Sequence, residues 1–189
     1  MIAGMQAPGI TRHRRPFLAP LWVTLLGMVV LAALAWALYR SGPTTVVLLV
    51  RPTEPAPGAI DDPPLGPEGE TRAARLAQMF GGDSGPGRID VIYETSDRRA
   101  EQTAAPLAER LHRAPVVFAS TDTQEVVSRA LRDHSGGTLL VVATGAVVPE
   151  MIRVLTGVPA PPAAPDESDL IYLVSVPRFG RTHLVRLRL

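Results

Sequence analysis

The chain of 189 residues contains neither cysteine nor lysine. The absence of cysteine excludes disulfide bonds, thiolate zinc sites and a cysteine nucleophile. All 19 basic residues are arginine, which excludes a Walker-type lysine, a Schiff-base lysine and a lysine general base. Aromatic residues make up only 5% of the chain, and it holds four histidines. Several of the side chains that most often act as nucleophiles or bases are therefore absent.

Acidic residues are missing from the N-terminal part of the chain. Residues 1–40 hold four arginines and no acidic residue, whereas residues 41–189 hold 15 arginines and 18 acidic residues. The formal net charge of +1 is thus the sum of +4 and −3. Because the larger part is net negative and poor in aromatic residues, we expect no nucleic-acid partner.

A long uncharged run extends from Phe17 to Tyr39. As a helix it would span about 34 Å, enough to cross a hydrocarbon core of about 30 Å. Three arginines precede the run and only Arg40 follows it, so the positive-inside rule assigns the basic flank, residues 1–16, to the cytoplasm. We therefore predict a single-pass transmembrane signal-anchor helix over residues 17–39 in a bacterial inner membrane. Residues 40–189 would form a periplasmic domain.

Two other export signals also fit this segment. A cleaved signal peptide has a shorter apolar core and a small-x-small cleavage site, which Ala33–Ala35 or Ala35–Ala37 supplies. The residues from Arg14 to Leu18 are similar to a twin-arginine signal. All three interpretations export the rest of the chain, and the sequence leaves anchor and cleavage open.

Beyond residue 40, short runs of β-branched residues alternate with segments typical of helices. This order predicts an α/β fold, a three-layer α/β/α sandwich with a mostly parallel sheet. The expected strands cover residues 44–50, 90–94, 116–119, 138–143, 170–176 and 182–187, the last two forming a hairpin, and the expected helices cover residues 67–80, 97–111, 123–134 and 148–155. Ligands of such sheets bind at the carboxyl ends of the strands, where Arg51, Thr95, Ser96, Ser120 and Thr144 are expected.

Four segments of this region carry distinctive motifs. They are TTVVLLVRPTEP (residues 44–55), DDPPLGPEGETRAARLAQMF (61–80), DVIYETSDRRAEQTAAPLAERL (90–111) and TLLVVATGAVVPEMIRVLTG (138–157). In order and spacing they resemble the histidine phosphatase superfamily, also called phosphoglycerate mutase-like. The corresponding family motifs are a strand ending in Arg-His-Gly, D-x-P-L-T-P-x-G, I-Y-x-S-P-x-x-R-x-x-x-T-A and Gly-His-Ser-Asn-Thr. The resemblance covers nearly all of residues 44–189 and implies the fold of that family.

The same resemblance implies that the catalytic histidines are missing. In the family, one histidine attacks the phosphoryl group, while a second histidine and two arginines hold its charge. Arg51 and Arg99 match the two arginines, but Pro52 and Thr144 stand where the two histidines are expected. A proline side chain has no nucleophile. The resemblance therefore implies an anion-binding pair, Arg51 and Arg99, beside two degraded catalytic positions.

None of the four histidines is expected to replace them. His13 would lie on the other side of the membrane, and His112 follows a helix as a solvated turn residue. His134 falls at a helix C-terminus, where its partial positive charge is favourable, and His183 lies in the last hairpin.

The hydroxyl groups of Thr53 and Thr144 have no histidine or lysine nearby in the sequence to act as a base. Glu54 is an alternative base, although a solvated loop residue is the simpler interpretation. We predict a membrane-anchored pseudoenzyme, without cofactor or metal, that binds a phosphorylated or other anionic ligand or a protein partner. Two alternatives stay open. One is an active phosphomonoesterase with a noncanonical nucleophile. The other is a structural or partner-binding module without an anion site, in which Arg51 pairs with Asp97 or Glu54.

Overall fold

The computed structural model describes residues 21–40, 42–52, 61–82, 87–145, 147–162 and 170–188. His13, Thr53, Glu54 and the basic flank of residues 1–16 lie outside these ranges. The chain divides into two compact units, Met1–Ser41 and Gly42–Leu189. The boundary lies close to the one predicted at residue 40.

In the first unit the structure describes one helix, α1 (Leu21–Arg40), within the run predicted to span a membrane. Large apolar side chains are exposed along it, and those of Leu25, Met28, Leu31 and Leu38 are each 64% to 69% exposed. Among the described residues, however, no helix has the length and apolar character that crossing a membrane requires. Residues 17–20 of the predicted span lie outside the described ranges.

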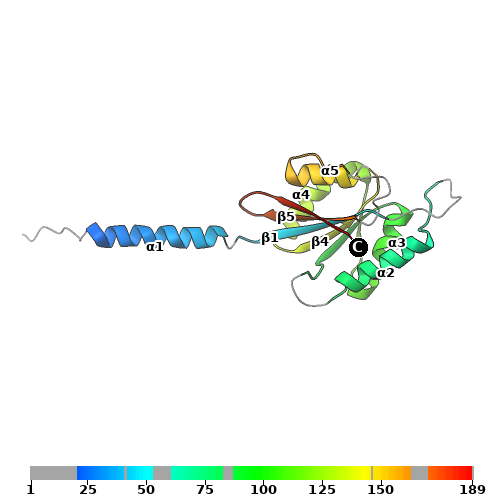
Figure 1. Ribbon diagram of the computed structural model, residues 1–189, viewed down its shortest axis with the longest axis horizontal. Coiled ribbons are helices and arrows are strands. Elements are labelled where there is room, and N and C mark those ends of the chain that lie inside the picture. The colour runs from blue at the N-terminus through cyan, green and yellow to red at the C-terminus, as the bar shows by residue number, and fades with distance from the viewer. Residues whose placement is uncertain are drawn as a thin grey trace, which may run out of the picture. The chain divides into compact units, whose positions relative to one another are not determined.

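The second unit is built on one six-stranded sheet with the order β3-β2-β4-β1-β5-β6 (Figure 1). The strands are β1 (Thr44–Val50), β2 (Val91–Thr95), β3 (Val116–Phe118), β4 (Thr138–Val142), β5 (Leu170–Pro177) and β6 (His183–Arg188). Strands β3, β2, β4 and β1 run parallel, β5 is antiparallel to β1, and β6 is antiparallel to β5. The sheet is therefore mixed, with a parallel part extended at one side by the predicted hairpin.

Helices cover both faces of this sheet, as predicted. Val47 and Leu49 of β1 pack in one core cluster with α4 and α5, whereas Leu48 and Val50 pack in another with α2 and α3. This division follows from the alternation of side chains along a strand. The helices are α2 (Pro67–Phe80), α3 (Arg98–Leu111), α4 (Thr123–Asp133) and α5 (Val147–Thr156), and a 3₁₀ turn at Ser120–Asp122 precedes α4. Figure 1 shows the two helix pairs on opposite sides of the sheet, which confirms the three layers.

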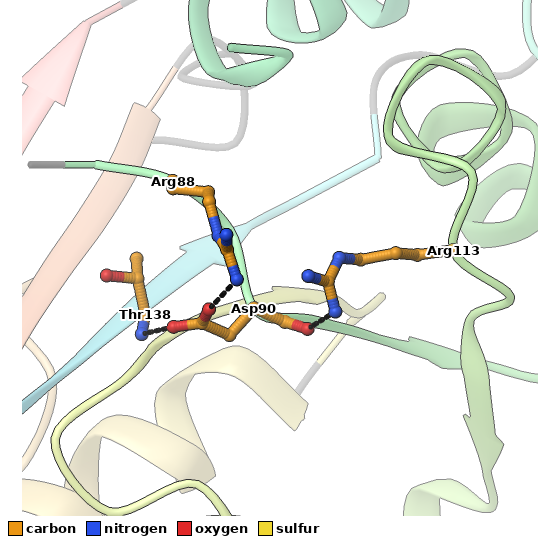
Figure 2. Close-up of polar contacts among 4 residues, drawn as sticks. All are labelled: Arg88, Asp90, Arg113 and Thr138. Atoms are coloured by element: carbon orange, nitrogen blue, oxygen red, sulfur yellow. Dashed lines mark hydrogen bonds and ion pairs between the residues drawn. The ribbon is translucent and has the colours of Figure 1, made fainter. Parts of the chain in front are cut away.

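Asp90 fixes the end of the sheet at which the parallel strands begin, here called the amino end. Its Oδ2 accepts a hydrogen bond from Thr138 N at 2.9 Å, its Oδ1 pairs with Arg88 Nη2 at 3.3 Å, and its carbonyl oxygen accepts from Arg113 (Figure 2). The hydrogen bond from the Thr138 N–H is the main cause that lowers the pKa of Asp90. These contacts hold the starts of β2 and β4 together, and the opposite, carboxyl end of the sheet is left for a site.

Candidate functional site

Four predicted site positions meet at the carboxyl end of the sheet. Arg51 and Pro52 follow β1, Thr95 ends β2, and Thr144 lies two residues beyond β4. The register pairs Val50 of β1 with Val142 of β4. Because β1, β4 and β2 are neighbours in the sheet, their ends lie side by side. The sequence therefore predicted correctly which end of the sheet gathers these residues.

The two positions where the family resemblance expects histidines contain no imidazole. Pro52 is buried two residues beyond the end of β1. Thr144 is half-buried, and its Oγ1 donates a hydrogen bond to Asp97 Oδ2 at 2.7 Å. Asp97 is the residue just before α3, and it lies 47 positions before Thr144 in the chain. A carboxylate thus contacts the second degraded position.

Asp97 is held in its ionised form by its surroundings. Its burial by itself raises the pKa, but the hydroxyl groups of Thr95 and Thr144 and the positive charge of Arg99 outweigh burial, so the pKa is lowered. Thr95 Oγ1 is itself buried and has no hydrogen-bond partner of ordinary geometry among the described residues. A carboxyl group with a lowered pKa carries a full negative charge at neutral pH.

Arg51 lines a cavity of about 240 Å³ together with residues of α5 and the loop that follows it. Tyr172 of β5 and Gly145 complete much of its wall. Among the described residues Arg51 forms no ion pair. The alternative in which Arg51 pairs with Asp97 is therefore not observed, and Asp97 accepts a hydrogen bond from Thr144. The pairing with Glu54 concerns a residue outside the described ranges.

A larger cavity of about 780 Å³ adjoins the first. It is lined by Thr144 on one side and by Ser120 and Thr121 of the 3₁₀ turn on the other. The two cavities share Gly145, Pro149 and Ala160 as lining residues. Thr144 and Arg51 thus border neighbouring spaces.

Arg99, the second arginine of the predicted anion-binding pair, lies near Asp97. It lies in the first turn of α3, is half-buried, and interacts electrostatically with Asp97. It is not among the described residues that line either cavity. The structure therefore brings Arg51 and Thr144 to adjoining cavities, while the charge of Arg99 acts on the carboxylate that binds Thr144.

The start of α3 is held by the segment that resembles the second family motif. Asp62 Oδ1 accepts a hydrogen bond from Arg98 N at 3.0 Å, and Gln102 Oε1 accepts one from Leu65 N at 2.7 Å. The first of these contacts caps a helix N–H that no residue within the helix can satisfy. These two contacts keep Asp97 and Arg99 at the carboxyl end of the sheet.

Sequence reasoning missed Glu94, a buried acid on β2. Its side chain is only 6% exposed, and Oε2 has no hydrogen-bond partner among the described residues. Burial, and then the negative charge of Glu101, raise the pKa of Glu94. The signal was available, because Glu94 is the one acidic residue in a strand made otherwise of apolar residues and threonine.

The three histidines within the described ranges all lie at the amino end of the sheet, as far from the site as the sheet allows. His112 caps the C-terminus of α3, and His134 follows the C-terminus of α4, where its ring meets Tyr93 edge-on at 6.2 Å. His183 begins β6 opposite Ser175. All three thus lie at the end of the sheet opposite to Pro52 and Thr144.

No family model and no curated protein matches this chain by sequence. Solved structures do match it in three dimensions. The protein histidine phosphatase SixA in complex with tungstate aligns with a TM-score of 0.60 at 17% identity, over 76% of this chain and 96% of its own. A putative α-ribazole-5′-P phosphatase from Escherichia coli aligns with a TM-score of 0.59 at 15% identity, over 77% and 96%. The mycobacterial glucosyl-3-phosphoglycerate phosphatase aligns at 0.54 and 15%, over 76% and 97%.

The chain has the histidine phosphatase fold. The fold predicted from four sequence motifs is thereby confirmed, and the described α/β unit spans nearly the whole length of these neighbours. In this histidine phosphatase fold, the carboxyl end of the sheet carries Arg51 and Thr144 as the motifs predicted. What the residues there do is a separate question, since identities of 15–17% bear on the fold alone.

Proposed function

We propose that this chain is a membrane-anchored, histidine phosphatase-like protein without phosphohistidine chemistry. It binds a phosphorylated or carboxylated ligand, or a protein partner that presents such a group, beside Arg51. The observation that carries the proposal is the hydrogen bond from Thr144 to Asp97, at a position where the family resemblance expects a histidine. An ionised carboxylate at that point repels a phosphoryl group that is being attacked.

Arg51 supports the binding part of the proposal. It faces a cavity and forms no ion pair among the described residues, so its charge is available to an anion. Ligand pockets for drug-sized molecules usually measure about 300–1,000 Å³. A cavity of about 240 Å³ therefore suits a small anionic group better than a large substrate. The structure of SixA, which shares the fold, is a complex with tungstate. We use this oxyanion as the probe in the test below.

One observation favours a second candidate function, an active phosphomonoesterase. The Thr144 hydroxyl donates a hydrogen bond to Asp97, as a nucleophile does to its general base, and the charge of Arg99 acts on that base. We rank it second because the pKa of Asp97 is lowered, which makes the carboxylate a weaker base. The threonine oxygen is also a much poorer leaving group than imidazole, so a phosphothreonine intermediate is much harder to hydrolyse than phosphohistidine.

The test uses the purified full chain in detergent with para-nitrophenyl phosphate, and tungstate as the anion. We expect no turnover, and a rise in melting temperature with tungstate that Arg51→Ala removes. At a free tungstate concentration of about 100 times Kd, linkage adds about 2.7 kcal/mol, or about 5–11 °C for a unit of this size. Asp97→Asn should tighten tungstate binding by removing a negative charge. The matched control is Arg129→Ala on α4, an exposed arginine paired with Glu125.

Three outcomes separate the hypotheses. Turnover that Thr144→Val and Asp97→Asn both abolish establishes the phosphomonoesterase. Turnover abolished by Arg51→Ala or Arg99→Ala likewise overturns the pseudoenzyme. No turnover together with no effect of tungstate leaves the structural module without an anion site.

The membrane anchor is a further part of the proposal. The uncharged run over residues 17–39 and the exposed apolar side chains along α1 support it, and the flanking arginines support a cytoplasmic N-terminus. Because the chain has no cysteine, a single Gln124→Cys variant reports topology cleanly. We expect the chain to resist alkaline extraction of bacterial membranes and the cysteine to react with an impermeant maleimide in intact cells. A mature mass lacking the first 35 or 37 residues would instead establish cleavage.

A further inference from the structure

The C-terminal hairpin is the most basic part of the second unit. From residue 170 to residue 189 the sequence has four arginines and no acidic residue. Residues 41–169 hold the other 11 arginines of the exported part and all 18 acidic residues. A hairpin of charge +4 therefore belongs to a domain that is otherwise −7. Arg186 and Arg188 lie along β6 toward the carboxyl end of the sheet, whereas the other two arginines lie in the turn at the amino end. Charge of one sign in the turn favours a negatively charged partner there.

The turn of this hairpin, residues 178–182, presents its charge together with an aromatic ring and is called the basic turn below. Arg178 and Arg181 are exposed, and Phe179 between them is 52% exposed. The Arg178 guanidinium lies 5.8 Å from the centre of the Phe179 ring. Arginine beside an exposed aromatic ring is typical of surfaces that lie at a membrane–water interface.

The basic turn lies where the chain enters the domain. Arg178 N donates a hydrogen bond to the carbonyl oxygen of Pro43 at 3.2 Å, and Pro177 pairs with Thr44 across the sheet. Only three residues separate Tyr39, the last residue of the proposed anchor, from Pro43. At no more than about 3.6 Å per residue, covalent geometry keeps Pro43 within about 14 Å of Tyr39.

The neighbouring charges at the amino end of the sheet do not oppose this. Arg88 and Arg113 both contact Asp90, so two arginines meet one carboxylate (Figure 2). Two exposed acids also lie at this end, Glu109 in the last turn of α3 and Asp133 at the end of α4, and each has an arginine as its chain neighbour. The excess of positive charge on this side therefore comes mainly from the basic turn.

We propose that the basic turn binds the headgroups of anionic phospholipids. The inference rests on the proposed membrane anchor, which holds the turn close to the bilayer surface. Arg178 and Arg181 then contact lipid phosphates through their guanidinium groups, and Phe179 reaches the interface. Each arginine near such a surface contributes about fivefold to binding, so the pair contributes about 30-fold.

The test uses the full chain, reconstituted in vesicles, with a dye on a single introduced cysteine. His183→Cys places the dye beside the basic turn, and Gln124→Cys places it in the first turn of α4, at the other end of the sheet. The vesicles contain a lipid with a nitroxide headgroup as quencher. They are made of phosphatidylcholine, with or without one quarter phosphatidylglycerol. We expect strong quenching at position 183 that needs phosphatidylglycerol and is reversed by 0.5 M salt, and weak quenching at position 124.

Two double variants sharpen this test. Arg178→Gln with Arg181→Gln should lower about 30-fold the ratio of molecules whose basic turn is bound to lipid to molecules whose turn is free. Arg75→Gln with Arg129→Gln removes the same charge from the middle of α2 and α4 and should leave the ratio unchanged. The salt titration of the parent chain needs no substitution in the turn and stands even if a variant unfolds.

Each failure has a distinct meaning. If the full chain does not float with vesicles, both the anchor and the docking are overturned. If it floats but position 183 is quenched no more than position 124, the docking alone is wrong. Equal quenching with and without phosphatidylglycerol also overturns it, because the turn is then close to the bilayer without recognising charge. The lipid docking is likewise overturned if an acidic peptide, but not the anionic lipid, binds at position 183.

Discussion

Replacing the buried carboxyl group of Glu94 should make the domain more stable. Glu94 is 6% exposed, its Oε2 has no hydrogen-bond partner among the described residues, and its neighbours across the sheet are Val117 and Val142. A buried polar group without a partner costs about 1–3 kcal/mol. We therefore expect Glu94→Leu to raise the free energy of unfolding by about 1–3 kcal/mol at pH 8, or about 2–12 °C in melting temperature.

The pH dependence gives the sign of this effect. Burial raises the pKa of Glu94 in the folded protein above the usual value of 4.5, with the charge of Glu101 as the second cause. Between the unfolded and the folded pKa, the folded state holds more protons than the unfolded state, so stability falls as the pH rises. Glu94→Leu removes this fall. Its gain over the parent chain should be smallest near pH 4.5 and should grow with pH until the folded pKa has been passed.

Thermal unfolding of the full chain in detergent, followed by circular dichroism between pH 4.5 and 8, measures this difference. Glu94→Gln removes the charge but keeps a polar group, so its gain should be smaller than that of Glu94→Leu. Glu101→Gln removes only the second cause and should have a smaller effect of the same sign. A Glu94→Leu variant that is less stable than the parent at pH 8 refutes the reasoning, since the carboxylate must then have a stabilising partner.

Three further predictions concern the scaffold. Asp90→Asn should lower the free energy of unfolding by about 1 kcal/mol at pH 7, as measured with urea. The expected loss is small because the Asp90 side chain is 35% exposed, so solvent weakens its ionic contacts. Since its folded pKa is lowered, this contribution is present above pH 3.8 and is lost as the pH falls through the folded pKa, so parent and variant should converge in acid. Gly137→Ala should lower the melting temperature, because its Cβ would lie 2.8 Å from Asp90 Oδ2; an unchanged value would show that Asp90 can move. Leu107→Ala, at a fully buried position of α3, should lower the free energy of unfolding by about 2–5 kcal/mol in the same urea assay, and a loss below 1 kcal/mol would contradict the packing.

The order of elements was predictable because each carried a local signal. The run Thr44–Val50 forms β1 as expected, and Pro67 begins α2 with Glu68 and Glu70 in its first turn. Element ends were less predictable. The second strand was expected at residues 90–94 but runs from Val91 to Thr95, and Asp90 just before it binds Thr138 through both its backbone and its side chain. Such boundaries depend on tertiary hydrogen bonds, which local sequence does not encode.

The site was predictable in location and not in contacts. The motifs placed Arg51 and Thr144 at one end of the sheet because each comes within two residues of the end of a parallel strand. They gave no sign that Asp97 would bind Thr144, or that Arg99 would act on Asp97 and line neither cavity. Those contacts depend on how α3 starts, which Asp62 sets from a distant loop.

The two ends of the sheet differ in their chemistry, and this difference links the two proposals. The carboxyl end carries hydroxyl groups, Asp97 and the cavity beside Arg51, whereas the amino end carries the described histidines and the basic turn. Strand β1 has seven residues, so at about 3.3 Å per residue the two ends lie about 23 Å apart. If the basic turn rests on lipid, Arg51 is held more than a Debye length from the anionic headgroups. A soluble anion then reaches Arg51 without repulsion from the membrane, so lipid docking and anion binding by the same chain do not compete.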